Sequence, residues 1–386
     1  MRPGQEDRSR DPGGDRYRRL SLWWDGVPGP VDSRHALDRD LDVDVVVIGA
    51  GFTGLWTARS LLVLDPTVRV AVLEAETAGF GASGRNGGWC SALFAASDRR
   101  IARDHGPEAA RQMRRAMQAA VDEVGRSAAE EGIDCRFAKG GTLVAARNAA
   151  QVTRARAEVE AARAAGWGED DLRWLGPDEA GARLGMDGLL GATFTPHCAA
   201  LDPGRLVRGL AAAVERLGAS VYERTAVASV EAGRTQRRPT VRTKGGTVRG
   251  DVVVPALEGW AGSLPGQRRS RVPIYSLMIA TEPLPDAFWS RAGLHRRETF
   301  SDHRHLVVYG QRTADGRLAF GGRGAPYHFG STVREAHDRV PRIHAALRRA
   351  LVELFPFLGD AAVTHAWGGP LGVPRDWFSS VGLDRA

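Results

Sequence analysis

Two features in the first hundred residues have the types and spacing needed to bind a dinucleotide. The first is a glycine-rich turn, Gly49-Ala50-Gly51-Phe52-Thr53-Gly54. In this spacing Gly49 permits a tight turn, Gly51 lets the backbone approach a pyrophosphate, and Gly54 allows a following helix to pack closely. The second is Glu74, which follows Gly54 by 20 residues. A carboxylate there can accept hydrogen bonds from a ribose and would repel the additional phosphate of NADP.

The segments around the turn are those that must position it. Val45–Ile48, with Val43 before them, form a short run rich in apolar β-branched residues, typical of a strand buried on both faces of a parallel sheet. A helix-like segment, Leu55–Leu64, follows the turn, and phosphates are favoured at a helix N-terminus by its free N–H groups and its dipole. A second strand-like run, Val68–Leu73, ends at Glu74. Because these segments occur in the expected order, the sequence predicts a dinucleotide site.

A second glycine-rich stretch, Gly79–Gly88, indicates which dinucleotide is bound. It reads GFGASGRNGG. An NAD-binding protein has no need of such a loop, whereas a flavin needs a second backbone segment that reaches its ribityl chain and ring. Ser83 and Asn86 offer short polar side chains, and Gly87-Gly88 leave room for a flat ring. The stretch therefore favours FAD over NAD.

The glycine turn, Glu74 and the segment GASGRNGG resemble the D-amino-acid-oxidase-type FAD-dependent oxidoreductases, and among them the bacterial amine oxidases of the gamma-glutamylputrescine oxidase kind. The resemblance extends from about Leu20 to the last residue and implies FAD as the cofactor. In the resembled proteins, backbone near Val227 meets the adenine. The cofactor-binding residues that we expect are Gly49, Ala50, Gly51, Phe52, Thr53, Gly54, Glu74, Ala75, Gly81, Ala82, Ser83, Arg85, Asn86, Gly87, Gly88, Val227 and Ala256.

The resemblance also implies a reaction. An amine or amino acid loses a hydride from its α-carbon to flavin N5, and the resulting imine is hydrolysed. The transfer needs the neutral amine, so the pocket must lower the pKa of the substrate amine by desolvation or nearby positive charge. Because no side-chain base is obligatory, the catalytic residues stay unknown. The expected partners are a small-molecule substrate and, as electron acceptor, oxygen.

Aromatic and basic residues near the presumed flavin are the candidates for contact with the substrate. They lie on or beside strand-like segments that the resemblance places over the flavin, and Arg323 can pair a substrate carboxylate in bidentate fashion, with a surface ion pair as the favoured alternative. The four candidates are Tyr275, Tyr309, Arg323 and Trp367.

Other chemistry has weaker signals. His303 and His305 have the spacing of a metal pair, but no third ligand is evident, and we expect no metal. The three cysteines are too widely spaced for a disulfide framework or a metal site. Cys90 lies just after the Gly-Gly pair, close enough to suggest covalent attachment of the flavin. A plain buried thiol is the favoured alternative.

The fold class predicted is α/β: a Rossmann-like FAD-binding domain with a parallel sheet and helices, and a second α+β substrate domain with an antiparallel sheet. Strands of that second sheet are expected at Arg271–Thr281, His305–Tyr309 and Arg317–Gly322, and an amphipathic helix at 107–131. The predicted divisions are a polar N-terminal tail at 1–40; a discontinuous FAD-binding domain at 41–98, 199–262 and 361–386; and a substrate domain at 99–198 and 263–360.

Composition narrows the class of protein. A chain of 386 residues with 43% hydrophobic residues can bury a substantial core, and it has no apolar run long enough to span a bilayer. The net charge of +7 comes almost entirely from arginines that alternate with acidic residues, which argues against a nucleic-acid partner. With no signal-peptide pattern at the N-terminus, a cytoplasmic enzyme is expected.

The end of the sequence suggests an alternative to a working oxidoreductase. Members of the resembled family continue past this point with a strand, a glycine-rich loop and a helix whose N-terminus points at the flavin. That helix dipole would stabilise negative charge on a reduced ring. The alternative to a working oxidoreductase is therefore a shortened, non-catalytic form with weak or no cofactor binding. An NAD-dependent enzyme is a further alternative, which the second glycine-rich stretch argues against.

Overall fold

The computed structural model describes residues 16–233, 237–322 and 327–383. Within these residues the chain forms two compact units. The first unit contains residues up to Arg85 together with Val207–Leu257, and the second contains Asn86–Leu206 and the residues from Glu258 onward.

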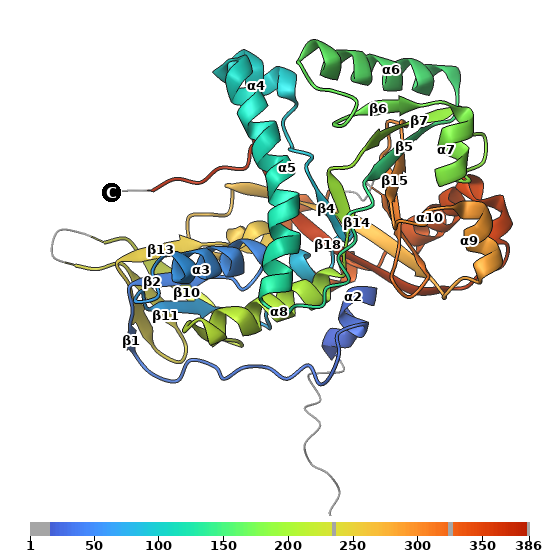
Figure 1. The fold of residues 1–386 in the computed structure, drawn as a ribbon. Coiled ribbons are helices and arrows are strands. Elements are labelled where there is room, and N and C mark those ends of the chain that lie inside the picture. Colours follow the sequence, from blue (N-terminus) through green and yellow to red (C-terminus); the bar gives the residue numbers. More distant parts are fainter. Residues whose placement is uncertain (1–15, 234–236, 323–326, 384–386) are drawn as a thin grey trace, which may run out of the picture. The chain divides into compact units, whose positions relative to one another are not determined.

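The first unit is built on a four-stranded parallel sheet in the order β13-β2-β3-β9. All residues of β2 and β3 are buried, as expected of strands covered on both faces. Helix α3 follows β2 directly (Figure 1). The predicted parallel sheet is therefore confirmed. The bounds are β2 Val45–Ile48, α3 Phe52–Leu64, β3 Val70–Leu73, β9 Ser220–Tyr222 and β13 Val252–Pro255.

A second sheet in the first unit was not expected from the sequence. Its order is β1-β12-β11-β10, with β1 parallel to β12 and the other pairs antiparallel. Apolar residues of this sheet and of the parallel sheet form one core cluster, which includes Val46, Ile48, Val241 and Val248. The bounds are β1 Leu41–Asp42, β10 Val227–Glu231, β11 Thr240–Thr243 and β12 Thr247–Arg249.

The second unit contains an eight-stranded sheet in the order β18-β14-β17-β16-β15-β5-β7-β6. Neighbouring strands are antiparallel except β15 and β5, which are parallel, so the sheet is mixed where an antiparallel one was predicted. The strand expected at His305–Tyr309 begins at Val308. The bounds are β5 Thr142–Ala146, β6 Arg173–Leu175, β7 Gly191–Thr195, β14 Arg271–Thr281, β15 Thr299–Asp302, β16 Val308–Arg312, β17 Leu318–Gly322 and β18 Val363–Pro374.

One face of this sheet carries the largest apolar core. Leu277, Phe300 and Phe320 project from the strands into a cluster that also contains Phe288 of α9 and Leu351 of α10. Both helices lie beside the sheet in Figure 1. A short antiparallel ribbon, β4 and β8, is a separate two-stranded sheet of the unit. The bounds are β4 Trp89–Ser91, β8 Cys198–Ala200, α7 Pro177–Arg183, α9 Asp286–Ala292 and α10 Pro341–Leu354.

The remaining helices complete the two units. The amphipathic helix predicted at 107–131 is α5, and Asp202 accepts a hydrogen bond from the Arg205 amide (3.2 Å) at the start of α8. Among the described residues no helix combines the length and apolar character needed to cross a bilayer. The bounds are α2 Leu22–Asp25, α4 Asp98–His105, α5 Pro107–Glu130, α6 Ala149–Ala164 and α8 Pro203–Arg216, with single 3-10 turns at η1 Ala82–Gly84, η2 Glu258–Ser263, η3 Phe329–Ser331, η4 Glu335–His337 and η5 Pro356–Leu358.

The compact units and the predicted divisions follow different boundaries. Residues 86–98, 199–206, 258–262 and 361–383, which we assigned to the FAD-binding domain, lie in the second unit. Leu20–Leu37, part of the predicted polar tail, contributes buried apolar side chains to the first unit. The functional roles of these segments stay predictions.

Candidate functional site

The turn between β2 and α3 accepts only glycine at two positions. Gly49 has a φ of +105°, and a Cβ there would lie 2.6 Å from the Ala256 carbonyl oxygen. A Cβ on Gly54 would lie 2.0 Å from the Gly49 carbonyl oxygen. Both distances join a side-chain atom to backbone, which cannot move aside cheaply, so the close helix–strand packing expected from the motif is present.

The two glycine-rich stretches meet at the N-terminus of α3. Gly51 is the N-cap and brings no side chain to the helix end. The Phe52 amide donates a hydrogen bond to Ser83 Oγ (2.8 Å), and a Cβ on Gly51 would lie 3.0 Å from that same oxygen. A small polar side chain of the second stretch therefore sits beside the end of the helix where an anion is favoured.

Glu74 lies at the end of β3, as the motif requires. Its Oε2 accepts a hydrogen bond from the Ala50 amide (2.9 Å), and its Oε1 accepts one from the Glu76 amide (3.0 Å). Burial raises the pKa of Glu74 to about 7, against the opposing effect of these two amides. The residue as a whole is half-buried, and the two amides hold its carboxyl group in place.

The other expected residues of the first unit lie near this carboxyl group or the turn. The Thr225 amide donates to the Glu74 carbonyl oxygen (2.7 Å), which places the chain just before Val227 beside Glu74. The Ala256 amide donates to the Ile48 carbonyl oxygen (2.8 Å), which holds the chain after β13 against the turn. Both expected segments therefore lie beside the motif, and their contact with the cofactor stays a prediction.

In the second unit, the Gly-Gly pair is held by one side chain of β16. Gln311 Nε2 donates to the Gly87 carbonyl oxygen (2.7 Å), and Asn86 Oδ1 accepts from the Gly88 amide (2.8 Å). A Cβ on Gly87 would lie 2.7 Å from the ring of Tyr309. Glycine at this position thus allows the aromatic ring to lie directly on the backbone.

Tyr309 is the centre of a polar and aromatic group that the sequence did not reveal. Its hydroxyl lies 2.6 Å from Ser276 Oγ, and its ring packs edge-on against Trp89 with centroids 5.9 Å apart. Trp89 Nε1 and Gln311 Oε1 are buried and have no hydrogen-bond partner among the described residues. A buried donor and a buried acceptor without partners, beside the same tyrosine, are groups that a bound ligand can satisfy.

The four predicted substrate residues do not form one group. Tyr275 and Ser276 are consecutive in β14 and therefore point to opposite faces of the sheet. Trp367 pairs with Met278, two residues from Ser276, and so shares the face of Ser276. Tyr275 instead lies in the apolar core, where its hydroxyl bonds the Arg334 backbone. Arg323 lies outside the described residues.

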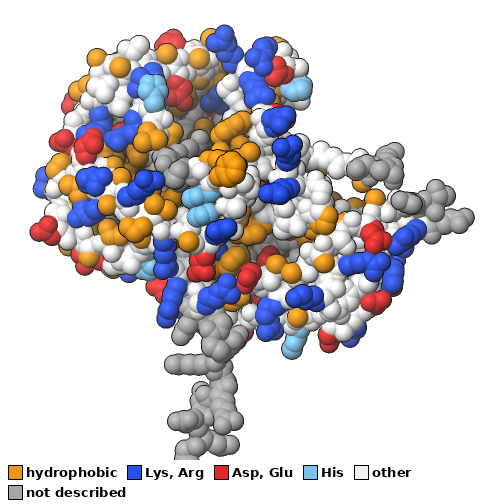
Figure 2. Space-filling view, turned by 180° about the vertical axis from the view of Figure 1, so that it is seen from behind, with side chains coloured by type: hydrophobic (Ala, Val, Ile, Leu, Met, Phe, Trp, Pro, Cys, Tyr) orange, Lys and Arg blue, Asp and Glu red, His pale blue; other side chains and the backbone are white. Residues whose placement is uncertain are grey.

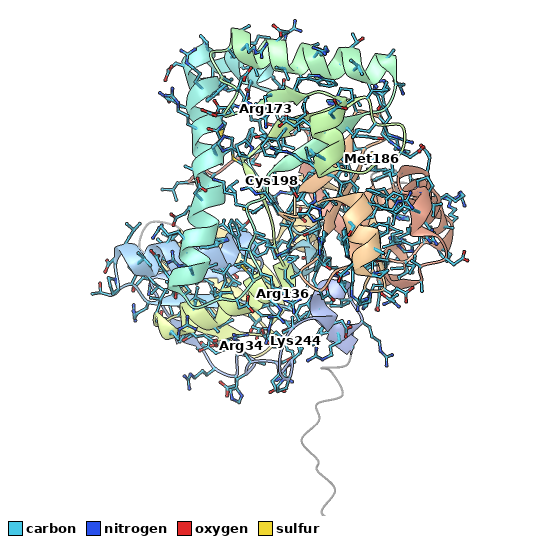
Figure 3. All side chains as sticks on the ribbon, turned by 45° about the vertical axis from the view of Figure 1, so that its right-hand side comes forward. Arg34, Arg136, Arg173, Met186, Cys198 and Lys244 are labelled. Carbon is cyan, nitrogen blue, oxygen red and sulfur yellow. The ribbon has the colours of Figure 1, made fainter. Side chains whose placement is uncertain are left out.

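The cysteines show none of the features of a reactive thiolate. Burial raises the pKa of Cys90 to about 12 and that of Cys135 to about 11. Cys198, labelled in Figure 3, is buried in β8 with its Sγ 3.4 Å from Thr299 Oγ1. All three are free. These properties favour the plain-thiol interpretation of Cys90 over covalent flavin attachment.

Metal-binding groups and surface charge concern the other kinds of site that the sequence raised. Within residues 16–233, 237–322 and 327–383, no group of three or more His, Cys, Asp or Glu side chains is arranged to hold a metal ion. Figure 2 shows Lys and Arg side chains spread over one face of the molecule with acidic side chains among them. On that face the positive charge is not gathered into one block.

Comparison with known proteins gives consistent matches. The family model described as FAD dependent oxidoreductase matches residues 44–384. The probable oxidoreductase OrdL of Rhizobium meliloti (strain 1021) is 32% identical over 348 residues, which cover 87% of this chain and 75% of that protein. The gamma-glutamylputrescine oxidoreductase of Escherichia coli (strain K12) is 28% identical over 335 residues, which cover 86% and 74%.

Solved structures match over a similar extent. Glycine oxidase from Geobacillus kaustophilus superposes with a TM-score of 0.72 at 22% identity, covering 89% of this chain and 86% of that one. L-proline dehydrogenase from P. horikoshii gives 0.68 at 18% identity, covering 90% and 86%. At these identities the likeness shows the fold.

The family match and the 32% identical relative confirm the resemblance that the glycine turn, Glu74 and GASGRNGG indicated. They also confirm FAD as the cofactor. The chain belongs to the family of FAD-dependent oxidoreductases.

Proposed function

We propose that this chain oxidises a C–N bond of an amine or amino acid. The observation that carries the proposal is the junction of the two glycine-rich stretches at the N-terminus of α3, formed by the Phe52–Ser83 hydrogen bond (2.8 Å) with Glu74 at the end of the next strand. Relatives named as a gamma-glutamylputrescine oxidoreductase and a glycine oxidase support amines and amino acids as the substrate class.

The first unit fits the adenosine diphosphate part of FAD. The N-terminus of α3 at Gly51 and Phe52 suits the phosphates because no N-cap side chain occupies it. Glu74 suits the ribose because its carboxyl group is positioned by two amides. We propose that the pyrophosphate, ribose and adenine are bound by Gly49, Ala50, Gly51, Phe52, Thr53, Gly54, Glu74, Ala75, Val227 and Ala256.

The second glycine-rich stretch is proposed for the flavin end. Gly81, Ala82, Ser83 and Arg85 belong to a loop that reaches the N-terminus of α3 through Ser83. Asn86, Gly87 and Gly88 follow directly in the chain. Trp89 Nε1 and Gln311 Oε1, the buried polar atoms near Gly87, add a hydrogen-bond donor and an acceptor that fit a polar heterocycle or its substrate.

When bound, the flavin supplies the oxidising group that takes a hydride from the carbon beside the substrate nitrogen. The chain's own contribution is to bind and orient the amine and to keep it neutral. The Tyr309 hydroxyl, held by Ser276 Oγ at 2.6 Å, can hydrogen-bond the substrate nitrogen. The Trp89 ring packs against Tyr309, and Trp367 lies on the same face of the eight-stranded sheet as Ser276. Desolvation by these apolar rings favours the neutral amine over the ammonium form.

The non-catalytic alternative is not favoured by the comparisons. The family model and the relatives named as oxidoreductases match most of the chain. We therefore propose an active enzyme, with oxygen as the electron acceptor.

Anaerobic mixing tests the proposal. Flavin-loaded protein is mixed without oxygen with a panel that contains glycine, L-proline, gamma-glutamylputrescine and simple primary amines, and the flavin absorption is followed. At least one compound should bleach the flavin bands, and admitted air should restore them. Dithionite serves as a control that the flavin is reducible. Bleaching by dithionite with no response to any amine or amino acid would contradict the proposed substrate class.

A further inference from the structure

The segment before the first strand packs into the first unit as a defined structure, which we call the arm (residues 16–37). Five of its side chains, Tyr17, Leu20, Trp24, Val27 and Val31, form a buried cluster, and Phe80 of the second glycine-rich stretch packs against it. Phe80 begins the loop Phe80–Arg85, which the proposed function assigns to the flavin end of the cofactor. The apolar partner of this loop is therefore the arm.

Ser21 makes a direct polar contact with the loop. Its Oγ donates a buried hydrogen bond to the Gly84 carbonyl oxygen (2.7 Å). The same oxygen accepts a hydrogen bond from the Trp24 amide (3.2 Å) and so caps the short helix α2. One side chain thus fixes the start of α2 and the middle of the loop together.

Trp24 fixes the loop by shape. It has no exposed surface, and a Cβ on Gly84 would lie 2.4 Å from its Nε1 atom. Gly84 therefore has to be glycine because the indole occupies the space of a side chain. Trp24 Nε1 has no hydrogen-bond partner among the described residues, so the indole is held by packing.

A stack of side chains extends this contact to both ends of the loop. The Tyr17 ring packs edge-on against the Phe80 ring, with centroids 6.3 Å apart. The Arg85 guanidinium lies over the Phe80 ring, 4.5 Å from its centroid, in a cation–π contact. Arg85 Nε also donates to the Phe80 carbonyl oxygen (2.8 Å). The first and last residues of the loop are therefore joined to each other and to the arm.

The far end of the arm holds the turn after Glu74. Glu223, whose side chain is fully buried, accepts hydrogen bonds from the Ala78 amide (2.8 Å), from the Arg34 amide (2.8 Å) and from Arg208 Nη1 (2.8 Å). Burial opposes the charged form of Glu223, but the charge of Arg208 and the hydrogen bonds from the Ala78 and Arg34 amides keep its pKa below the ordinary value. Arg34, labelled in Figure 3, adds its guanidinium at 3.0 Å.

We propose that the arm is a positioning element of the cofactor site, and that Ser21 and Trp24 set the conformation of the loop Phe80–Arg85 for the flavin end of FAD. The inference rests on the proposed function, which assigns that loop to the flavin end. The adenosine diphosphate end depends mainly on the Gly49–Gly54 turn and Glu74, and among the described residues Ser21 and Trp24 form no hydrogen bond with either. Ser83 of the loop also reaches the N-terminus of α3, but backbone amides dominate the phosphate site there, so loss of an arm contact should weaken FAD binding more than ADP binding.

The test compares FAD and ADP affinities of full-length variants, with the melting temperature of each cofactor-free protein as a check on folding. Ser21→Ala removes the bond to Gly84, and Trp24→Phe keeps an aromatic ring but opens space against Gly84. Ser97→Ala is the matched control, because Ser97 caps α4 through the Arg100 amide as Ser21 caps α2, in the other unit. Ser21→Thr keeps the hydroxyl and should restore affinity.

Ser21→Ala and Trp24→Phe should raise the FAD dissociation constant about five- to tenfold, the value of one buried hydrogen bond or a small cavity, with ADP changed less than about twofold. Unchanged FAD affinity in both variants, or an equal loss of FAD and ADP affinity, would overturn the inference while leaving the proposed function intact. A wild-type chain that binds ADP but not FAD would overturn the proposed function and the inference with it.

Discussion

The phosphate-binding turn of the first unit and the Tyr309 group of the second unit are built in different ways. The turn consists of backbone, and Gly49 and Gly54 allow the strand, the turn and the helix to pack closely. All parts of this site lie within about thirty residues of one another in a single βαβ unit. The Tyr309 group consists of side chains from two strands. Ser276 of β14 hydrogen-bonds the Tyr309 hydroxyl, and Gln311 of β16 hydrogen-bonds the backbone of Gly87. Local sequence spacing can encode the first arrangement and cannot encode the second.

The largest difference between the two regions should appear on adding one methyl group to the turn. In Gly54→Ala the new Cβ would lie 2.0 Å from the Gly49 carbonyl oxygen, so the helix must move away from the strand. FAD affinity should fall by at least about a hundredfold, and the first unit should lose stability. Gly181→Ala, on the exposed surface of α7 with no atom within 4 Å of the new Cβ, is the control and should bind FAD normally.

Glu74 sharpens the comparison within the first unit. Glu74→Gln keeps the shape but removes the charge, so one charge-assisted hydrogen bond to the ribose should be lost. That bond is worth roughly 1.5–3 kcal/mol, or about ten- to a hundredfold in the FAD dissociation constant. Equilibrium titration measures it. An unchanged constant would remove Glu74 from the ribose site.

The pH dependence of FAD binding follows from the raised pKa of the same residue. Without cofactor Glu74 takes up a proton below about pH 7. Donation from the ribose stabilises the carboxylate and lowers its pKa, so binding releases a proton and affinity rises with pH up to about 7. The dissociation constant should fall about tenfold between pH 5.5 and 7.5. In Glu74→Gln the slope should vanish; a slope that persists would assign the proton to another group.

The smallest effect is expected in the second unit and should concern turnover. Tyr309→Phe removes the hydrogen bond to Ser276 Oγ and should lower kcat/KM for the amine about fivefold, with FAD affinity unchanged. Tyr275→Phe is its matched control on the opposite face of the sheet, where the hydroxyl hydrogen-bonds the Arg334 backbone. It should lower the melting temperature and leave kcat/KM unchanged. Equal losses of kcat/KM would contradict the assignment of faces.

The outcome of the sequence analysis follows this division. The sequence placed Gly49 and Gly54 in the turn and Glu74 at the end of the next strand, as the structure has them, because a βαβ unit is local. Glycine is required in the turn for steric reasons that lie mainly within this unit. The hydrogen bond between the Phe52 amide and Ser83 was not predicted. The sequence indicated only that the two glycine-rich stretches bind the same cofactor, because no spacing rule joins them.

The grouping of the substrate candidates depends on contacts between distant residues, which the sequence does not encode. Tyr275 and Tyr309 were grouped because both lie on strands of one sheet, but the alternation of side chains sends Tyr275 into the core with Leu277. The arm was grouped with a polar tail at 1–40, and the sequence did not identify its partners: Trp24 and Ser21 contact Gly84, about sixty residues away, which a local pattern does not show.

A competition titration of the full-length chain tests the central claim most directly. Cofactor-free protein is titrated with FAD, followed by flavin fluorescence, in the absence and presence of excess NAD. Two glycine-rich stretches that serve one flavin dinucleotide predict one FAD site per chain, unaffected by NAD, and a flavin that acid precipitation releases to the supernatant. Displacement of FAD by NAD at similar concentration, or failure of the chain to bind FAD, would contradict it.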